Sequence, residues 1–221
     1  MKKTLPAVLT LLCLCHFLNG FAESFGEIRK KAEAGDVFRQ VLLGYMYDAG
    51  NGTPQDFKEA AKWYRKAAEQ GNDTAQYVLG GMYDSGRGVP KDHKEAARWC
   101  RKAAIQGNAS AQNNLGGMYA TGRGVSKDDK QAVQWWHKAA SQGVASAQNN
   151  LAVRFVVGKG VPKDFISAYA WYSVAARNGF KGAAQKRDGL GRVIPRDQMN
   201  KARAMARDLI NRIEAKKRSK K

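Results

Sequence analysis

The chain has 221 residues, of which 38 are lysine or arginine and 19 are aspartate or glutamate, so its formal net charge is +19. Two of its three cysteines, Cys13 and Cys15, lie in an apolar N-terminal run. If that run is removed, Cys100 has no partner within the chain, which excludes a disulfide-based fold and leaves packing to supply stability. The rest of the chain contains no apolar stretch long enough to predict a membrane span.

Residues 1–22 have the pattern of an export signal. A basic start at Lys2 and Lys3 precedes an apolar run, and the sequence Gly20-Phe21-Ala22 places small residues where a signal peptidase reads them. We therefore expect cleavage after Ala22 and a periplasmic or secreted protein. Leucine, rather than a small residue, precedes each of the two early cysteines, so lipidation is not expected.

A period of 36 residues governs the chain from Gly35 onward. A period of this length indicates an array of small supersecondary units, which bury their apolar faces only by stacking into a solenoid. Such an architecture favours binding over catalysis. The residues that recur without slippage are glycines 35, 71, 107, 143 and 179, leucines 43, 79, 115 and 151, and tryptophans 63, 99, 135 and 171.

The unit 71–106 is typical of an antiparallel helix pair. Leu79 lies on the apolar face of a first helix, which the glycine- and proline-rich run 86–90 interrupts. Asp92 is placed to cap a second helix, whose buried side carries Trp99. Cys100 aligns with aromatic packing positions in the other units, so we expect a buried thiol and not a nucleophile.

The units are expected at residues 35–70, 71–106, 107–142 and 143–178. Residues 23–34 are predicted to form an N-terminal capping half-repeat. Residues 179–213 are predicted to form a partial repeat followed by a C-terminal capping helix, and residues 214–221 a basic tail. The expected fold is all-α: a right-handed solenoid of about four helix-turn-helix repeats, closed at both ends by capping helices.

The recurring motif resembles a known family. Leu-Gly-x-x-Tyr, then Gly-x-Gly-Val-x-x-Asp, Ala-x-x-Trp and Lys-Ala-Ala resemble the Sel-1-like repeats, a branch of the tetratricopeptide-like α-solenoids. The resemblance covers about residues 35–180 and departs from the pattern at Thr53, Ser126, Ala152 and Phe155. It implies a concave face lined by the first helices and an adaptor role, often in bacterial envelopes.

If tetratricopeptide geometry holds, the positions two before and two after each repeat leucine face the groove. Asparagine there can pair with both groups of a peptide backbone, and glycine allows close approach at a helix cost of about 1 kcal/mol. The alternative is that these are simply solvated residues on an open face. The candidate binding residues are Tyr45, Tyr77, Gly81, Asn113, Gly117 and Asn149.

No pattern predicts a metal site, a cofactor or a catalytic centre. His93 and His137 occupy non-equivalent positions without metal-ligand spacing. The sequence Gly86-Arg87-Gly88 recurs after a helix in every unit, which favours a turn and not a phosphate loop.

Three functions remain open. The first is an exported monomeric scaffold for a protein or peptide. The second is an enzyme, since a cysteine-rich branch of the resembled family is linked to β-lactam binding or hydrolysis; that branch carries a cysteine pair per unit, unlike this chain. The third is binding of an anionic envelope component through the basic tail, which alternatively is only a solvated charge block. Export argues against nucleic acid as the partner.

Overall fold

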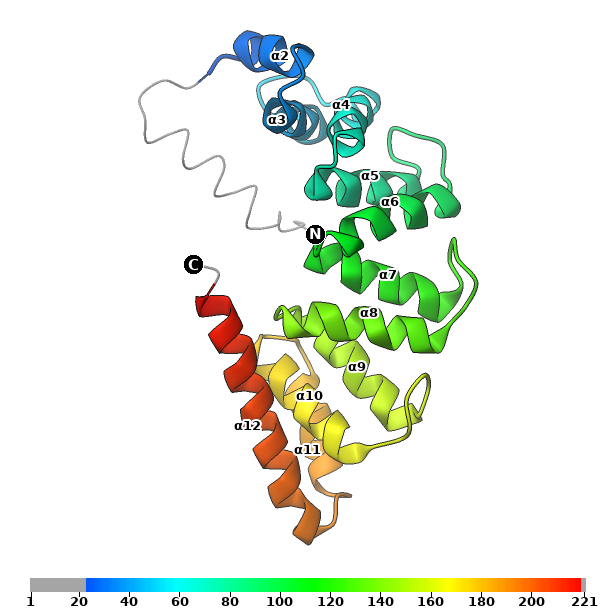
Figure 1. Ribbon diagram of the computed structural model, residues 1–221, viewed down its shortest axis with the longest axis vertical. Helices are drawn as coiled ribbons and strands as arrows, with labels where there is room; N and C mark the ends of the chain where they lie inside the picture. The colour runs from blue at the N-terminus through cyan, green and yellow to red at the C-terminus, as the bar shows by residue number, and fades with distance from the viewer. Residues whose placement is uncertain (1–22, 220–221) are drawn as a thin grey trace.

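The computed structural model describes residues 23–219, and this part of the chain folds into eleven helices (Figure 1). The predicted export signal, residues 1–22, and the last two residues of the predicted tail lie outside the described residues. None of the described helices combines the length and apolar character that crossing a bilayer requires. The helices are α2 Phe25–Glu33, α3 Val37–Ala49, α4 Phe57–Glu69, α5 Asp73–Ser85, α6 His93–Ile105, α7 Ala109–Thr121, α8 Asp129–Ser141, α9 Ala145–Val157, α10 Phe165–Arg177, α11 Ala183–Gly191 and α12 Arg196–Arg218.

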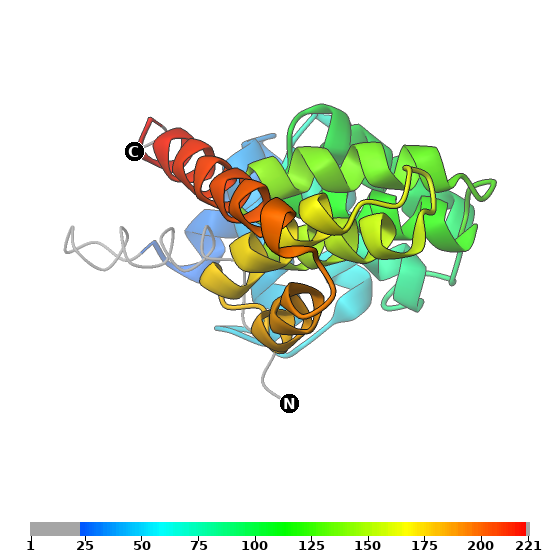
Figure 2. The ribbon, with the colours of Figure 1, turned by 90° about the horizontal axis from the view of Figure 1, so that it is seen from below.

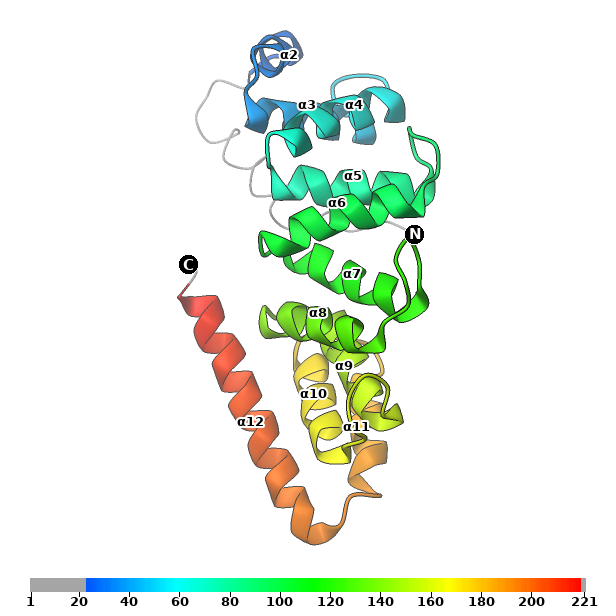
Figure 3. The same ribbon diagram turned by 45° about the vertical axis from the view of Figure 1, so that its right-hand side comes forward.

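The helices stack in chain order into an α-solenoid, as the repeat predicted. Each of the pairs α3–α4, α5–α6, α7–α8 and α9–α10 forms one unit, and the second helix of each unit packs against the first helix of the next (Figures 1 and 3). The last helix departs from this order, because α12 runs back alongside α10 (Figure 2).

Local chemistry fixes where each helix starts and stops. The Asp92 carboxylate accepts hydrogen bonds from the backbone N–H groups of Lys94 and Glu95, which confirms its predicted capping role. The glycine Gly88 (φ 72°) allows the turn to touch the preceding unit, since a Cβ there would lie 1.9 Å from the carbonyl oxygen of Phe57. The turns therefore set the spacing between units as well as reversing the chain.

The core is built from the recurring apolar positions, with one exception. The four repeat leucines are fully buried, and Trp99 is 3% exposed. Trp135 was expected to be buried in the same way, but it is partly exposed. Its neighbour Trp136 is 4% exposed instead, and donates a hydrogen bond from Nε1 to the carbonyl oxygen of Asn113 at 3.1 Å. A second indole fills the interior of this unit, where the other units carry a smaller side chain.

A column of buried amides, which we call the glutamine spine, joins the units. In the second unit, Gln76 donates to the carbonyl of Ala68 at 3.0 Å and accepts from Gln106 at 2.8 Å, while Gln106 also donates to the carbonyl of Gly71. The buried amides are almost inaccessible and are hydrogen-bonded, as interior polar groups must be. The spine consists of the pairs Gln40–Gln70, Gln76–Gln106, Gln112–Gln142 and Gln148–Asn178.

Both ends of the array are covered. At the N-terminus, Glu23 forms two hydrogen bonds with the Arg39 guanidinium, at 3.0 and 3.2 Å, and pairs with Lys31. At the C-terminus, α12 buries Met199 and Ile213 and continues to Arg218, so part of the segment expected to be a tail is helical. Lys217 is anchored there through a 3.0 Å hydrogen bond to Oδ1 of Asn178.

Candidate binding face

The candidate binding residues lie on the exposed side of the first helices, called here the first-helix face: the sides of α3, α5 and α7 that carry Tyr45, Tyr77, Gly81, Asn113 and Gly117. Two consecutive glycines show how the helices are oriented. A Cβ on Gly116 would lie 2.7 Å from the Trp136 ring, whereas one on Gly117 would meet nothing within 4 Å. Gly81 is equally open, so both face glycines leave the helix backbone accessible.

A small hollow of about 30 Å³ lies on this face between α5 and α7. Tyr77 and Gly81 line it from α5, Asn114 lines it from α7, and Cys100 lies at its inner side. Burial raises the pKa of the Tyr77 phenol, so this group stays a neutral hydrogen-bonding hydroxyl. The hollow thus offers polar groups above an apolar floor.

Ion pairs close the end of this face nearest the turns. Asp84 lies 2.9 Å from Nδ1 of His93 and 3.3 Å from Nε of Arg123, which belongs to the next turn. Asp48 makes the corresponding pair with Arg87 at 3.2 Å. Burial raises the pKa of Asp48, with Arg87 opposing the shift. These two aspartates therefore connect neighbouring units through their ion pairs.

The two asparagines among the candidate residues differ in exposure and in hydrogen bonding. Asn113 is partly exposed, and its Oδ1 atom is buried without a hydrogen-bond partner among residues 23–219. Asn149 was expected on an open face, but it is 7% exposed and accepts a hydrogen bond from Nζ of Lys186 at 3.1 Å. Helix α11 covers it, because that helix stacks where another first helix would follow. The open face therefore ends before Asn149.

Tyr45 lies half-buried on α3 and packs against an apolar cluster that joins the first and second units. Together with Tyr77 it places aromatic surface on successive first helices. The structure brings five of the six candidate residues onto a face that stays open across three units.

Cys100 is buried, as its alignment with aromatic positions predicted. Burial, reinforced by nearby Asp84, raises the pKa of its thiol to about 12, and Sγ donates to the carbonyl of Ala111 at 3.1 Å. The thiol is therefore neutral at physiological pH and unsuited to nucleophilic attack. Among the described residues, no group of three or more His, Cys, Asp or Glu side chains is placed to hold a metal ion.

Sequence reasoning missed the glutamine spine. The available signal was the recurrence of Gln40, Gln76, Gln112 and Gln148 at 36-residue intervals on the first helices. Glutamine is usually a surface residue, so its recurrence did not point to the core.

Comparison with known proteins places the repeat in a family. The Sel1 repeat model matches residues 40–72, 73–108, 109–144 and 145–180. A Sel1 repeat protein from Oxalobacter formigenes is 35% identical, with a TM-score of 0.69 over 83% of this chain and 74% of its own. A protective antigen of uropathogenic Escherichia coli strains, which displays an SLR fold, is 44% identical with a TM-score of 0.68. That match covers 70% of this chain, which spans only 33% of the antigen. No curated protein matches the chain.

Proposed function

The chain belongs to the Sel1 repeat family, a family of protein-interaction scaffolds, and from this premise we propose that its first-helix face binds an extended segment of a partner protein. The proposal places the ligand across α3, α5 and α7, in contact with Tyr45, Tyr77 and Gly81 and with Asn113 and Gly117 on α7. The protein acts by holding its partner and not by transforming a substrate.

The observation that carries this proposal is the pair of open glycines one unit apart. Gly81 and Gly117 each cost their helix about 1 kcal/mol relative to alanine. Neither is required by packing, because a Cβ would meet no atom within 4 Å. A ligand backbone lying against the helices would use the space that a side chain would take. A small rotation of the Asn113 amide would also present its unpaired acceptor to a ligand N–H, relieving an unsatisfied polar atom.

We further propose that the protein is exported and works as a monomer in the periplasm or outside the cell. Support comes from the signal-like residues 1–22 and from the first residue of the expected mature chain. Glu23 already takes part in the fold through Arg39 and Lys31, so cleavage after Ala22 would leave the N-terminal contacts intact. Mass spectrometry of envelope fractions is expected to find an N-terminus at Glu23. An intact chain found only in the cytoplasm would contradict export.

The binding face is tested by crosslinking capture from envelope extracts. Wild-type protein is compared with Gly117→Trp, which fills the open face, and with Gln134→Trp, which adds the same bulk at an exposed position on α8. Partners recovered by wild type and by Gln134→Trp should be lost with Gly117→Trp. Equal recovery by all three proteins would show that partners bind elsewhere. Circular dichroism checks that both variants keep the helical fold.

A further inference from the structure

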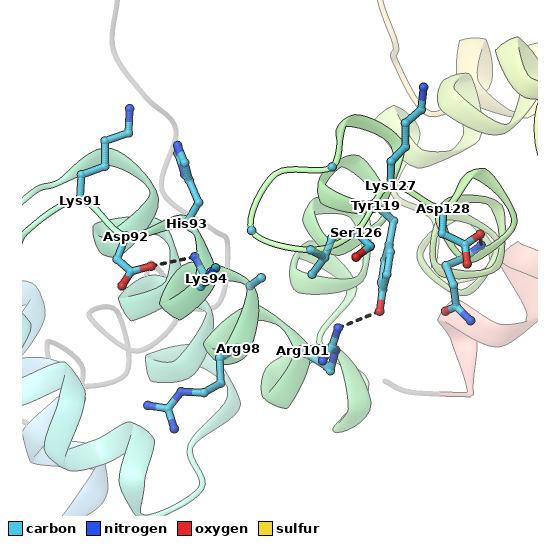
Figure 4. Close-up of a pocket in the computed structure, with 15 residues that line it drawn as sticks. Lys91, Asp92, His93, Lys94, Arg98, Arg101, Tyr119, Ser126, Lys127 and Asp128 are labelled. Carbon is cyan, nitrogen blue, oxygen red and sulfur yellow. Dashed lines mark hydrogen bonds between the residues drawn. The ribbon is translucent and has the colours of Figure 1, made fainter.

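A second, larger hollow lies on the opposite set of helices. It is a groove of about 1320 Å³ between the start of α6 and the turn that joins α7 to α8 (Figure 4). None of the residues proposed for the first-helix face lines it. We call it the basic groove, defined by its five cationic side chains, Lys91, Lys94, Arg98, Arg101 and Lys127.

The positive charge of the basic groove is poorly compensated from within. Its two carboxylates serve as helix caps: Asp92 accepts backbone N–H groups at the start of α6, and Asp128 accepts that of Gln131 at the start of α8. Within residues 23–219, no carboxylate lies within 4.0 Å of the ammonium groups of Lys91, Lys94 or Lys127. The lysines are therefore available to an incoming anion.

The two arginines are held more firmly. Arg101 donates to the hydroxyl of Tyr119 at 2.8 Å, and Arg98 lies over the Trp99 ring while bonded to Glu95 at 2.8 Å. Ala97 and Val125 add apolar surface to the lining of the groove. Two positioned guanidinium groups and three lysines without a carboxylate partner suit an extended chain that carries several carboxylates, because such a chain can contact more than one cation at once.

This charge is only partly a property of the repeat, because the positions of Lys94 and Lys127 hold lysine in both neighbouring units, whereas other positions of the groove differ. One unit further on, the positions of Arg98 and Arg101 hold Gln134 and His137, and that of His93 holds Asp129. One unit earlier, the position of Lys91 holds Gln55, and that of Gln131 holds the acidic Glu95. The junction of the second and third units therefore holds five cationic side chains at these positions, against four at the preceding junction and three at the following one.

Ser126 adds a second distinctive feature. The equivalent residues of the neighbouring turns are Pro90 and Pro162, and proline has no N–H to donate. In Figure 4, Lys91 and Lys127 extend in the same direction, with Ser126 between them. Ser126 is exposed, and neither its N–H nor its hydroxyl forms a hydrogen bond within the described part of the chain. It supplies two free donors to the basic groove.

We propose that the basic groove binds an acidic, extended segment of a partner protein, independently of the first-helix face. Charge complementarity selects this occupant: a second copy of a chain with a net charge of +19 would be repelled. A concave groove also suits a single strand better than the plane of a lipid surface.

The test measures binding of a fluorescent Glu-rich decapeptide and of its Gln-rich counterpart by anisotropy. The Glu peptide is expected to bind at least about tenfold more tightly at low salt and to lose affinity as ionic strength rises. The double variant Lys94→Glu/Lys127→Glu should weaken its binding about tenfold. The matched control Lys130→Glu/Lys163→Glu carries the same charge change one unit further on and should weaken it less than about threefold, since distant exposed charges are screened.

Two further variants distinguish binding in the basic groove from binding at the rest of the surface. Ser126→Pro introduces the residue found in both neighbouring turns. It should weaken binding of the Glu peptide about threefold without changing the melting temperature of the protein, because a hydrogen bond to a charged group contributes a few-fold to affinity. Gly117→Trp should leave Glu-peptide binding unchanged, which keeps this test independent of the proposed function.

Three results would overturn the proposal. Equal affinity for the Gln and Glu peptides would show that charge does not select the ligand. Equal loss in the two double variants would show diffuse attraction to the whole surface. Binding to phosphatidylglycerol vesicles that displaces the Glu peptide, and that survives Lys94→Glu/Lys127→Glu, would assign the anion site to a membrane-binding surface elsewhere.

Discussion

Lys186 donates a hydrogen bond to Oδ1 of Asn149 across 37 residues of sequence. The same separation relates Tyr77 to Asn114, which line one hollow from successive first helices. Helix α11 therefore stacks as the next first helix, although it lacks the repeat motif. This contact buries Asn149, so the candidate residues that remain accessible lie on α3, α5 and α7.

We predict that replacing the tryptophans by alanine lowers the stability of the protein by unequal amounts. Trp99→Ala and Trp136→Ala should each lower the free energy of unfolding by about 3–5 kcal/mol, because each removes a buried indole and leaves a cavity. Trp135→Ala should cost about 1–2 kcal/mol, since that ring is partly exposed. Chemical denaturation of the three variants provides the comparison, and an equal loss for Trp135→Ala would contradict the assignment of Trp136 as the interior residue.

The glutamine spine predicts a polar contribution to stability. Gln112→Ala should lower the free energy of unfolding by about 1–3 kcal/mol, because it removes the hydrogen bonds that Gln112 makes with the carbonyl of Ala104 and with the amide of Gln142. The control Gln134→Ala, at an exposed position, should change stability by less than about 0.5 kcal/mol. If urea unfolding does not distinguish the two variants, the buried amides do not stabilise the array.

Two adjacent glycines offer a test of helix orientation. Gly117→Ala should stabilise the protein by up to about 1 kcal/mol, because alanine is the better helix former and its Cβ meets open space. Gly116→Ala should destabilise it by about 1–3 kcal/mol, because its Cβ would lie 2.7 Å from the Trp136 ring. Melting temperatures that shift in the same direction would show that α7 is rotated from the orientation described.

Acid should loosen the N-terminal cap. Hydrogen bonds from Arg39 and then from Lys31 lower the pKa of Glu23 to about 2. A lowered carboxyl pKa contributes stability that is present above the ordinary value near 4.5 and is lost as the pH falls through about 2. Amide exchange in α2 should accelerate over that interval. Glu23→Gln should remove this pH dependence, and an unchanged profile in the variant would place the titrating group elsewhere.

The sequence predicted the buried positions and the helix cap that recur in every unit. Leu79, Trp99 and the cap at Asp92 are specified within one unit, and a 36-residue recurrence leaves one way to stack such units. The family and the α-solenoid fold followed from that register.

The errors arose where a residue depends on a neighbour outside its own unit pattern. Asn149 is covered by a helix that carries no repeat motif, and Trp135 is partly exposed although Trp63, Trp99 and Trp171 at the same repeat position are buried. The extension of α12 beyond residue 213 depends on contacts with Asn178 that local composition does not reveal.

The glutamine spine also bears on how such an array can change in length. Its links span 8, 30 and 35 residues, so each begins and ends within one unit or at the edge of the adjoining one. Loss or duplication of one whole 36-residue block between Gly71 and Gln142 rejoins every link, whereas a length that is not a multiple of 36 leaves buried amides unmatched. Gene segments that encode one unit can thus be lost or duplicated without breaking the buried hydrogen bonds. The number of units that a partner contacts can therefore change one unit at a time during evolution.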